Sequence, residues 1–294
     1  MHALTLARQR IRDRIQNPST PAQVRLAHGM MENGRTRYLP VLSSALAQDI
    51  LTRGYDPRTL ERIYANRADG ELGPVGKVAD RLVLNLPLHE ALRERLEAAT
   101  GEIAAAVALS VRAGAADFRL LSAPCGLANE VLGAARRLQA RHPEALCVFR
   151  CWGVDSDADG SLLPEARRRA AAAGVRATFI HEDLRRLREV RGVVAAEGRF
   201  HFISCVGLLQ RFSLTEARAL VKFYAESLEP GGTLLIDRWN RTAPTRVAKG
   251  LGIEPPALSE RELRSLLEDA GLALEREHPS GEGGCVLVVA RKPA

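Results

Sequence analysis

The chain has 294 residues, of which 46% are hydrophobic, so it can bury the core of one large domain or of two modest ones. No apolar run approaches the roughly 18 residues that a membrane-spanning helix needs. The first ten residues alternate charge in a helical pattern that differs from a signal peptide. We therefore expect a cytoplasmic protein with no membrane partner.

The chain is basic, with a formal net charge of +7, which raises the question of a nucleic-acid partner. All but four of its 42 basic residues are arginines spread along the chain, and the clusters at 167–169 and 185–186 lie beside acidic residues. Aromatic residues make up only 4% of the chain, which leaves few platforms for stacking unpaired bases. The composition therefore disfavours nucleic acid as a partner.

The five cysteines do not form a metal-binding or redox pattern. They include no Cys-x-x-Cys pair and no cluster flanked by histidines, and most of them lie in predicted strands. Buried, reduced thiols are the interpretation that fits this distribution. We therefore expect no metal site.

The N-terminal part of the chain shows helical periodicity and no strand-like run. We predict a glycine-rich break at residues 69–76 and a long helix at 88–113, preceded by helices at 3–15, 21–31, 39–53 and 57–64. The chain is therefore predicted to consist of a helical segment, residues 1–87, and a second domain, residues 88–294.

Strands and helices alternate from residue 118 onward. Strands are predicted at 118–122, 147–154, 177–181, 200–206 and 233–237, with helices at 184–196 and 215–228 among the connections. Two further strands, 272–277 and 285–291, flank a glycine-rich loop and are typical of a hairpin. The alternation predicts a doubly wound α/β fold, in which ligands bind at the carboxyl ends of the parallel strands.

This region resembles the class I S-adenosylmethionine-dependent methyltransferases. The resemblance rests on the strand, turn and helix of residues 118–130, on Asp155 after the second strand, on the Pro230-Gly231-Gly232 turn before the fifth strand, and on the final hairpin. It covers about residues 115–294. It implies a seven-stranded, mostly parallel sheet with an antiparallel last strand, S-adenosylmethionine as cofactor, and residues 1–87 as a helical cap.

The resemblance also assigns cofactor contacts at the strand ends. Asp155 resembles the acid that accepts hydrogen bonds from both ribose hydroxyls; alternatively, Asp155 caps a helix and Asp157 or Asp159 binds the ribose. Asp183 resembles the acid that contacts the adenine amino group, and it can also cap the helix at 184–196. The predicted cofactor site includes the neighbours of these acids, Ser156, Glu182 and Leu184.

The first loop departs from the family's pattern of an acid followed by Gly-x-Gly-x-Gly. Ser122 replaces the acid, and Pro124, Gly126 and Ala128 stand at the glycine positions. Ala128 keeps the side chain small beside a ligand, whereas Pro124 restricts the backbone. Because Ser122 has no carboxylate, Asn129 or Glu130 on the following helix is expected to contact the amino acid end of the cofactor; the alternative is an ordinary polar first turn.

The predicted fourth strand has no evident general base at its carboxyl end. Neither an Asn-Pro-Pro-Tyr sequence nor a histidine or aspartate follows it, since His201 lies at its start and His181 lies on the adenine side. A carboxylate or a neutral amine needs alignment more than proton removal, so we expect such an acceptor. The predicted catalytic residues are Asn129, Ser204 and Tyr64. Other candidates for the acceptor side, or alternatively for packing, are Tyr55, Asn66, Arg67, Arg238, Trp239 and Asn240.

Three functions are compatible with these residues. The first is methylation of a small molecule, with a carboxylate or amine acceptor, in secondary metabolism. The second uses the aminocarboxypropyl carbon of S-adenosylmethionine, by transfer or by cyclisation to a small-ring amino acid, and releases methylthioadenosine; the altered first loop motivates it. The third, disfavoured by the intact strand-end acids and the composition, is a binding protein without catalysis or an RNA methyltransferase.

Overall fold

The computed structural model describes residues 44–71, 73–157, 160–239, 258–281 and 284–294. The helices predicted at 3–15 and 21–31, together with Asp159 and Asn240, lie outside these ranges. The chain divides into two compact units. Among the described residues, the first unit comprises 44–93 and Gly281, and the second comprises the remainder.

The first unit is helical. It contains α4 (Ala45–Arg53), α5 (Pro57–Ala65), α6 (Gly73–Leu84) and the first residues of α7 (Pro87–Arg112), so helices predicted at 39–53 and 57–64 are present with α4 beginning at Ala45. The break predicted at 69–76 is wrong for residues 73–76, because α6 begins at Gly73. Pro74 lies in its first turn, where proline has no hydrogen bond to lose.

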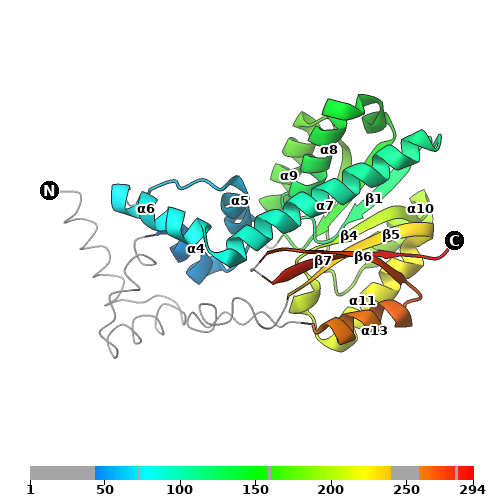
Figure 1. The fold of residues 1–294 in the computed structure, drawn as a ribbon. Helices are drawn as coiled ribbons and strands as arrows, with labels where there is room; N and C mark the ends of the chain where they lie inside the picture. Colours follow the sequence, from blue (N-terminus) through cyan, green and yellow to red (C-terminus); the bar gives the residue numbers. More distant parts are fainter. Residues whose placement is uncertain (1–43, 72, 158–159, 240–257, 282–283) are drawn as a thin grey trace. The chain divides into compact units, whose positions relative to one another are not determined.

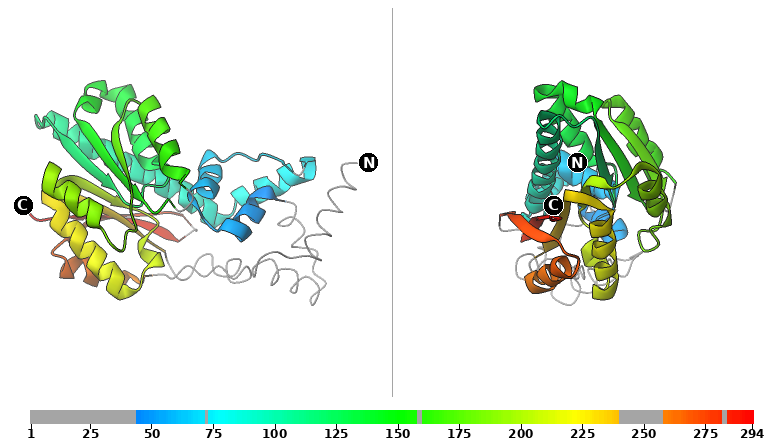
Figure 2. Two further views of the ribbon diagram at one scale, coloured as in Figure 1. Left: turned by 180° about the vertical axis from the view of Figure 1, so that it is seen from behind. Right: turned by 90° about the vertical axis from the view of Figure 1, so that its right-hand side faces the viewer.

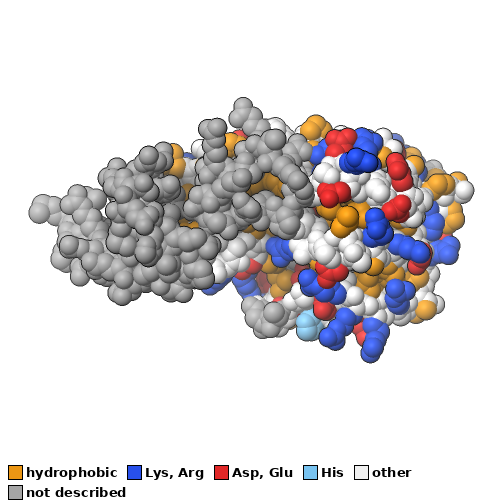
Figure 3. All heavy atoms as spheres, turned by 90° about the horizontal axis from the view of Figure 1, so that it is seen from below, with side chains coloured by type: hydrophobic (Ala, Val, Ile, Leu, Met, Phe, Trp, Pro, Cys, Tyr) orange, Lys and Arg blue, Asp and Glu red, His pale blue; other side chains and the backbone are white. Residues whose placement is uncertain are grey.

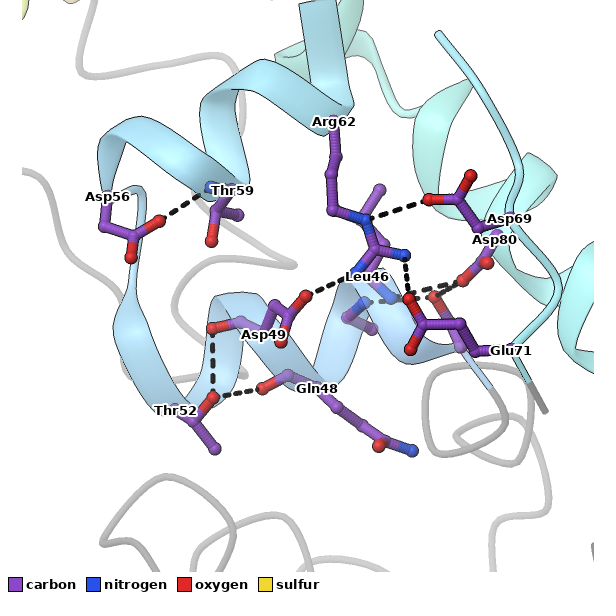
Figure 4. Close-up of polar contacts among 12 residues, drawn as sticks. Leu46, Gln48, Asp49, Thr52, Asp56, Thr59, Arg62, Asp69, Glu71 and Asp80 are labelled. Atoms are coloured by element: carbon purple, nitrogen blue, oxygen red, sulfur yellow. Dashed lines mark hydrogen bonds and ion pairs between the residues drawn. The ribbon is translucent and has the colours of Figure 1, made fainter. Parts of the chain in front are cut away.

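Acidic side chains join the helices of this unit. The buried Asp80 of α6 accepts hydrogen bonds from the Ser44 hydroxyl (2.7 Å) and from the backbone N–H groups of Leu46 and Gly70 (3.2 Å each). Around Arg62 of α5, the carboxylates of Asp49, Asp69 and Glu71 form ion pairs (Figure 4). These contacts join α4 to α5 and to α6 within the first unit.

The second unit is built on a seven-stranded sheet with the strand order β3-β2-β1-β4-β5-β7-β6. β7 runs antiparallel to β5 and β6, and the other pairings are parallel. This topology confirms the predicted doubly wound, mostly parallel sheet. The strands are β1 (Phe118–Ser122), β2 (Phe149–Asp155), β3 (Arg176–His181), β4 (Phe200–Cys205), β5 (Leu228–Trp239), β6 (Ala273–Pro279) and β7 (Cys285–Arg291).

Helices cover both faces of this sheet (Figures 1 and 2). One face packs against α7, α8 (Asn129–Arg141) and α9 (Leu162–Ala172), through a core that includes Ile103, Leu132 and Leu120. The other face packs against α10 (Arg188–Glu197), α11 (Leu214–Ser227) and α13 (Glu260–Asp269), through a core that includes Leu121 and Ile203. Apolar residues on both faces of the central strands explain why those strands appear as continuous hydrophobic runs in the sequence.

The starts of the second and fifth predicted strands differ most from the structure. Cys147 belongs to the 3-10 helix η2 (Pro143–Cys147), so β2 begins at Phe149 and Cys147 is exposed. The expected turn at Pro230-Gly231-Gly232 is part of β5. The backbone of Gly231 and Gly232 exchanges hydrogen bonds with Lys292 beyond the end of β7, which extends the ladder through the glycines.

Charges of both signs are mixed on the surface. Figure 3 shows arginine and lysine interspersed with aspartate and glutamate over the described part of one face. Asp117, for example, accepts hydrogen bonds from Arg119 (2.6 Å) and Arg150 (2.7 Å), and these contacts lower the pKa of Asp117, the hydrogen bond from Arg150 having the largest effect. None of the helices in the described ranges is both long and apolar enough to span a bilayer.

Candidate functional site

The carboxyl ends of β1, β2 and β4 bring the predicted site residues to one edge of the sheet. In the strand register, Ser122 at the end of β1 is paired with Gly153 of β2 on one side and with Ser204 of β4 on the other. Paired residues of parallel strands project to the same face, so the side chains of Ser122 and Ser204 share the face covered by α7 and α8. This edge is where a doubly wound sheet binds ligands.

The loop after β1 is held by both neighbouring strands. The Ala123 N–H donates to the carbonyl of Ser204 (2.9 Å), and the Cys125 N–H donates to the carbonyl of Val154 (2.9 Å). On the opposite side, the buried Tyr224 of α11 donates its hydroxyl to the carbonyl of Ala123 (3.0 Å). The backbone of this loop is therefore fixed before any ligand binds.

Two residues of the loop have left-handed backbone conformations. Gly126 has a φ of 49°, and Ala128, which precedes α8, has a φ of 58°. Alanine is uncommon in this region of φ/ψ space, whereas glycine enters it freely. Ala128 thus adopts a glycine-like conformation at a position where the family's pattern has glycine, and Pro124 stands in the same loop, partly exposed.

The carboxylate of Glu130 lies against Ser122 at the end of β1. Glu130 is the second residue of α8, and its Oε1 accepts a hydrogen bond of 2.8 Å from the hydroxyl of the fully buried Ser122. Desolvation raises the pKa of the Glu130 carboxyl group, and the hydrogen bond from Ser122 and the charge of Arg95 lower it by less. A carboxylate is therefore present at the end of β1, although it comes from the helix.

Asp155 at the end of β2 contacts the same loop. Its Oδ2 accepts a hydrogen bond from the N–H of Gly126 (2.8 Å), and desolvation raises its pKa, although the backbone N–H groups of Gly126 and Ser156 lower it. The side chain of Ser156 is exposed. Asp155 thus links the end of β2 to the first loop and is oriented by it.

The alternative ribose acid, Asp157, has another role. Its two carboxylate oxygens accept hydrogen bonds from the backbone N–H groups of Leu162 and Leu163, each at 2.9 Å, at the start of α9. Asp157 is buried, so it caps this helix. Asp155 makes no such bond to α9 in the described part of the chain.

The three residues after β3 lie in different environments. Glu182 is buried, and its carboxylate accepts hydrogen bonds from the N–H groups of Glu189 (2.8 Å) and Val190 (3.2 Å) in the first turn of α10. Leu184 packs in the core on the α10 and α11 face. Asp183 is exposed and accepts a hydrogen bond from the N–H of Arg185 (3.0 Å). Glu182 therefore caps α10, and Asp183 is the exposed carboxylate of this segment.

Ser204 is a buried hydroxyl group without a hydrogen bond. It is fully buried at the end of β4, and its Oγ has no partner among the described residues. Asn129, the first residue of α8, is partly exposed, and its side chain makes no hydrogen bond to the described part of the chain. An unsatisfied buried hydroxyl costs folding free energy, so it requires an explanation such as a ligand.

A buried ion pair near this edge has no local signal in the sequence. Arg95 of α7 donates to Oδ2 of Asp237 in β5 at 2.6 Å, and both side chains are buried. The Oδ1 of Asp237 accepts a hydrogen bond from the N–H of Gly207 (2.7 Å), the second residue after β4. Arg95 also lies over the Trp239 ring, 6.0 Å from its centroid. The helical periodicity of residues 88–113 gave no sign that Arg95 is buried.

The remaining candidates lie elsewhere in the second unit or belong to the first unit. His201 accepts a hydrogen bond from the N–H of Arg119 near the start of β4, and His181 is exposed at the end of β3. Arg238 pairs with Glu260 and Glu277.

The candidates of the first unit lie on or next to α5. Tyr64 is partly exposed on α5, and Asn66 is the residue after its last turn. Tyr55 contacts His89, and Arg67 pairs with Asp69. The described residues include no cluster of histidine, cysteine and acidic side chains suited to a metal ion.

Comparisons with known proteins bear on this architecture. No protein-family model matches the chain, and no curated protein matches its sequence. Among solved structures, a possible exported protein from Bordetella parapertussis is 22% identical, with 100% of this chain and 96% of that chain covered and a TM-score of 0.62. Magnesium protoporphyrin IX methyltransferase from Synechocystis PCC 6803, with bound adenosylhomocysteine, is 19% identical, with 83% and 97% covered and a TM-score of 0.52. Together with the strand order, these similarities show that the chain has the class I S-adenosylmethionine-dependent methyltransferase fold.

Proposed function

We propose that the protein is an S-adenosylmethionine-dependent methyltransferase that acts on a small molecule through a carboxylate or amine acceptor. The observation that carries the proposal is the pair formed by Ser122 and Glu130 at the end of β1, with Asp155 at the end of the neighbouring strand. These two carboxylates lie where a doubly wound sheet binds nucleotide-like ligands. The magnesium protoporphyrin IX methyltransferase, which shares the fold, holds adenosylhomocysteine.

Each end of the cofactor has a chemically suited partner in this proposal. Asp155 accepts hydrogen bonds from the ribose hydroxyls, Asp183 contacts the adenine amino group, and Glu130 pairs with the ammonium group of the methionine part. Charge-assisted hydrogen bonds of this kind are roughly twice as strong as neutral ones. The Ser204 hydroxyl, which has no partner among the described residues, is available to the same part of the ligand. The cofactor supplies an electrophilic carbon on its sulfonium.

The acceptor class follows from the groups around the end of β4. Asp237, a buried carboxylate on the neighbouring strand β5, is already bonded to Gly207 and Arg95. His201 lies at the opposite end of β4, so neither residue is placed to take a proton from an alcohol. A carboxylate or a neutral amine attacks without a dedicated base once it is aligned, which is the reaction we propose.

The remaining assignments stay predictions. They are that residues 1–87 form a cap, that Tyr64 takes part in catalysis, and that the enzyme is cytoplasmic and belongs to secondary metabolism. These assignments can be tested once the acceptor has been identified.

A second candidate function is attack at the aminocarboxypropyl carbon of S-adenosylmethionine, with release of methylthioadenosine. The placement of Glu130 favours it, because this carboxylate lies at the end of β1, where the methionine part of the cofactor is expected. The two candidates predict different products from the same cofactor, so they can be separated by chromatography.

The test begins with binding. Calorimetric titration of the full chain with adenosylhomocysteine is expected to give saturable one-site binding, and its absence would contradict both candidates. Incubation with S-adenosylmethionine and a panel of small carboxylic acids and amines is then expected to give adenosylhomocysteine only with an acceptor. Methylthioadenosine formed without an acceptor would support the second candidate, and binding without either product would indicate a binding protein.

A further inference from the structure

We propose that Glu130 is the proton acceptor for the amino group of bound S-adenosylmethionine, and that the site thereby supports attack of this amine on the cofactor's own aminocarboxypropyl chain. The inference rests on the proposed binding of S-adenosylmethionine with its methionine part at the end of β1. It develops the second candidate function by naming the residue that takes the proton and by making S-adenosylmethionine the only substrate of that reaction.

The surroundings of Glu130 fix one of its oxygens. Oε1 accepts the hydrogen bond from Ser122, a hydroxyl at the end of a central strand whose residue is fully buried. Because α8 begins directly after the anchored first loop, the backbone at Glu130 is fixed as well. The carboxylate is thus held at a defined position at the end of β1, as a group that transfers a proton to or from a ligand must be.

Two charged side chains on different elements act on Glu130. Arg95 on α7 is bonded to Asp237 and lowers the pKa of Glu130, Asp155 on β2 raises it, and desolvation raises it most. The thiols of Cys125 and Cys151 are also near and are kept neutral, since burial raises their pKa values. The net effect is a raised pKa for Glu130, closer to the roughly 7.7 to 8.0 of an α-amino group. A closer match between the two pKa values favours proton transfer.

The neutral residues beside Glu130 suit an amine that has lost its proton. Ser204 is the strand neighbour of Ser122, and its buried hydroxyl lacks a partner among the described residues. A hydroxyl can accept a hydrogen bond from a neutral amine and orient its lone pair without taking its proton. Asn129, the residue before Glu130, offers an amide group with the same property. The same edge thus holds one proton acceptor and two neutral orienting groups.

The reaction is balanced without any other reactant. The carboxylate of Glu130 takes one proton from the ammonium group, and the freed nitrogen lone pair attacks the chain carbon bonded to sulfur. A carbon–nitrogen bond forms as the carbon–sulfur bond breaks, and the electron pair of the broken bond neutralises the sulfonium. The products are methylthioadenosine and a four-membered ring amino acid with a protonated ring nitrogen, and Glu130 releases its proton to solvent.

The experiment incubates the full chain with S-adenosylmethionine alone and quantifies products by liquid chromatography with mass spectrometry. We expect methylthioadenosine and the four-membered ring amino acid in equal amounts, well above a blank without protein. The blank is essential because S-adenosylmethionine also decays by attack of its carboxylate, which gives a lactone instead. Only lactone, or no product above the blank, would overturn the proposal.

Two variants identify the role of Glu130. Glu130→Gln keeps the shape of the side chain but cannot take a proton, so methylthioadenosine release at saturating S-adenosylmethionine should fall by at least about 100-fold. Glu189→Gln is the matched control, since Glu189 is also the second residue of its helix but is exposed, and it should release methylthioadenosine at the wild-type rate. Equal rates for Glu130→Gln and the wild type would overturn the assignment.

The pH profile and a binding measurement complete the test. The wild-type rate should fall as the pH drops through the raised pKa of Glu130, and this fall should be absent from the residual rate of Glu130→Gln. A merely structural role of Glu130 predicts the same profile for both proteins. Calorimetry with adenosylhomocysteine distinguishes failure of this inference from failure of the proposed function. If adenosylhomocysteine binds but no methylthioadenosine is formed from S-adenosylmethionine, only this inference is overturned. If adenosylhomocysteine does not bind, the proposed function is overturned as well.

Discussion

The hydroxyl of Ser122 at the end of β1 donates a 2.8 Å hydrogen bond to the carboxylate of Glu130 in the first turn of α8. This contact places a negative charge at the edge of the sheet without an acidic residue on the strand itself. Because Glu130 lies on α8 and not on β1, the position of its carboxylate depends on the loop that connects β1 to α8. That loop is fixed by backbone bonds to β2 and β4, so the arrangement has a defined geometry.

The first prediction concerns Asp155. Its carboxylate is proposed to accept two hydrogen bonds from the ribose, so Asp155→Ala should weaken adenosylhomocysteine binding by about 2 to 4 kcal/mol, measured by calorimetry. Asp157→Ala serves as the control, because this residue caps α9; it should lower the free energy of unfolding by about 1 kcal/mol and leave the affinity unchanged. An affinity for Asp155→Ala within twofold to threefold of the wild type would place the ribose acid elsewhere.

A second prediction addresses the neutral groups at the site. Ser204→Ala and Asn129→Ala should each lower turnover by at least about tenfold and change the cofactor affinity much less, as expected for contacts made mainly in the transition state. Ser204→Ala should also stabilise the unliganded protein by up to about 1 kcal/mol, because it removes an unsatisfied buried hydroxyl. Wild-type turnover in both variants would show that neither residue organises the reaction.

A third prediction tests the packing beneath the first loop. A Cβ atom at Gly153 of β2 would lie 2.6 Å from the Phe179 ring and 3.1 Å from Cβ of Cys125, so Gly153→Ala should destabilise the protein by about 1 to 3 kcal/mol. Gly192, inside α10, has open space around it, and Gly192→Ala should instead stabilise by roughly 0.5 to 1 kcal/mol. Urea unfolding of both variants measures whether their changes in the free energy of unfolding have opposite signs. Changes of the same sign would contradict the prediction.

A fourth prediction concerns pH and the first unit. His89 is buried, accepts the hydroxyl of Tyr55 at 3.2 Å, and contacts the carbonyl of Val83 at 2.6 Å; burial lowers its pKa to about 4. The folded state holds His89 neutral, so protonation of His89 favours the unfolded state. The contribution of His89 to the free energy of unfolding should be complete above about pH 6.5 and should fall by up to roughly 3 kcal/mol as the pH drops to about 4.

The measurement compares urea unfolding of the wild type and of His89→Gln across this pH range. Glutamine does not titrate, so the part of the pH dependence due to His89 should disappear in the variant. Identical pH dependence in the wild type and His89→Gln would contradict the prediction.

The sequence was sufficient to predict the sheet because the strands carry strong local patterns. Of the parallel strands, β1, β2, β4 and β5 are buried along most of their length and read as apolar runs. The hairpin of β6 and β7 has a glycine-rich connection. The errors lie where a long-range contact overrides the local pattern. Gly231 and Gly232 were expected to form a turn, but their backbone bonds to Lys292 make them part of a strand.

The site residues were predictable only in part, for the same reason. Asp155 was placed by its position at a strand end, which is a local feature. The burial of Arg95 against Asp237, the hydrogen bond of Glu130 to Ser122, and the use of Glu182 to cap α10 all join segments that are separate in the sequence. Such pairings depend on the register of strands and helices, which composition and periodicity do not specify.

The most direct measurement of the central claim is calorimetric binding of two ligands to the wild type and to Glu130→Gln. Adenosylhomocysteine carries the amino acid group that Glu130 is proposed to bind, and methylthioadenosine lacks it. Glu130→Gln is expected to weaken adenosylhomocysteine binding by at least about tenfold and to leave methylthioadenosine binding within about twofold of the wild type. Equal weakening of both ligands, or no weakening of either, would contradict this claim.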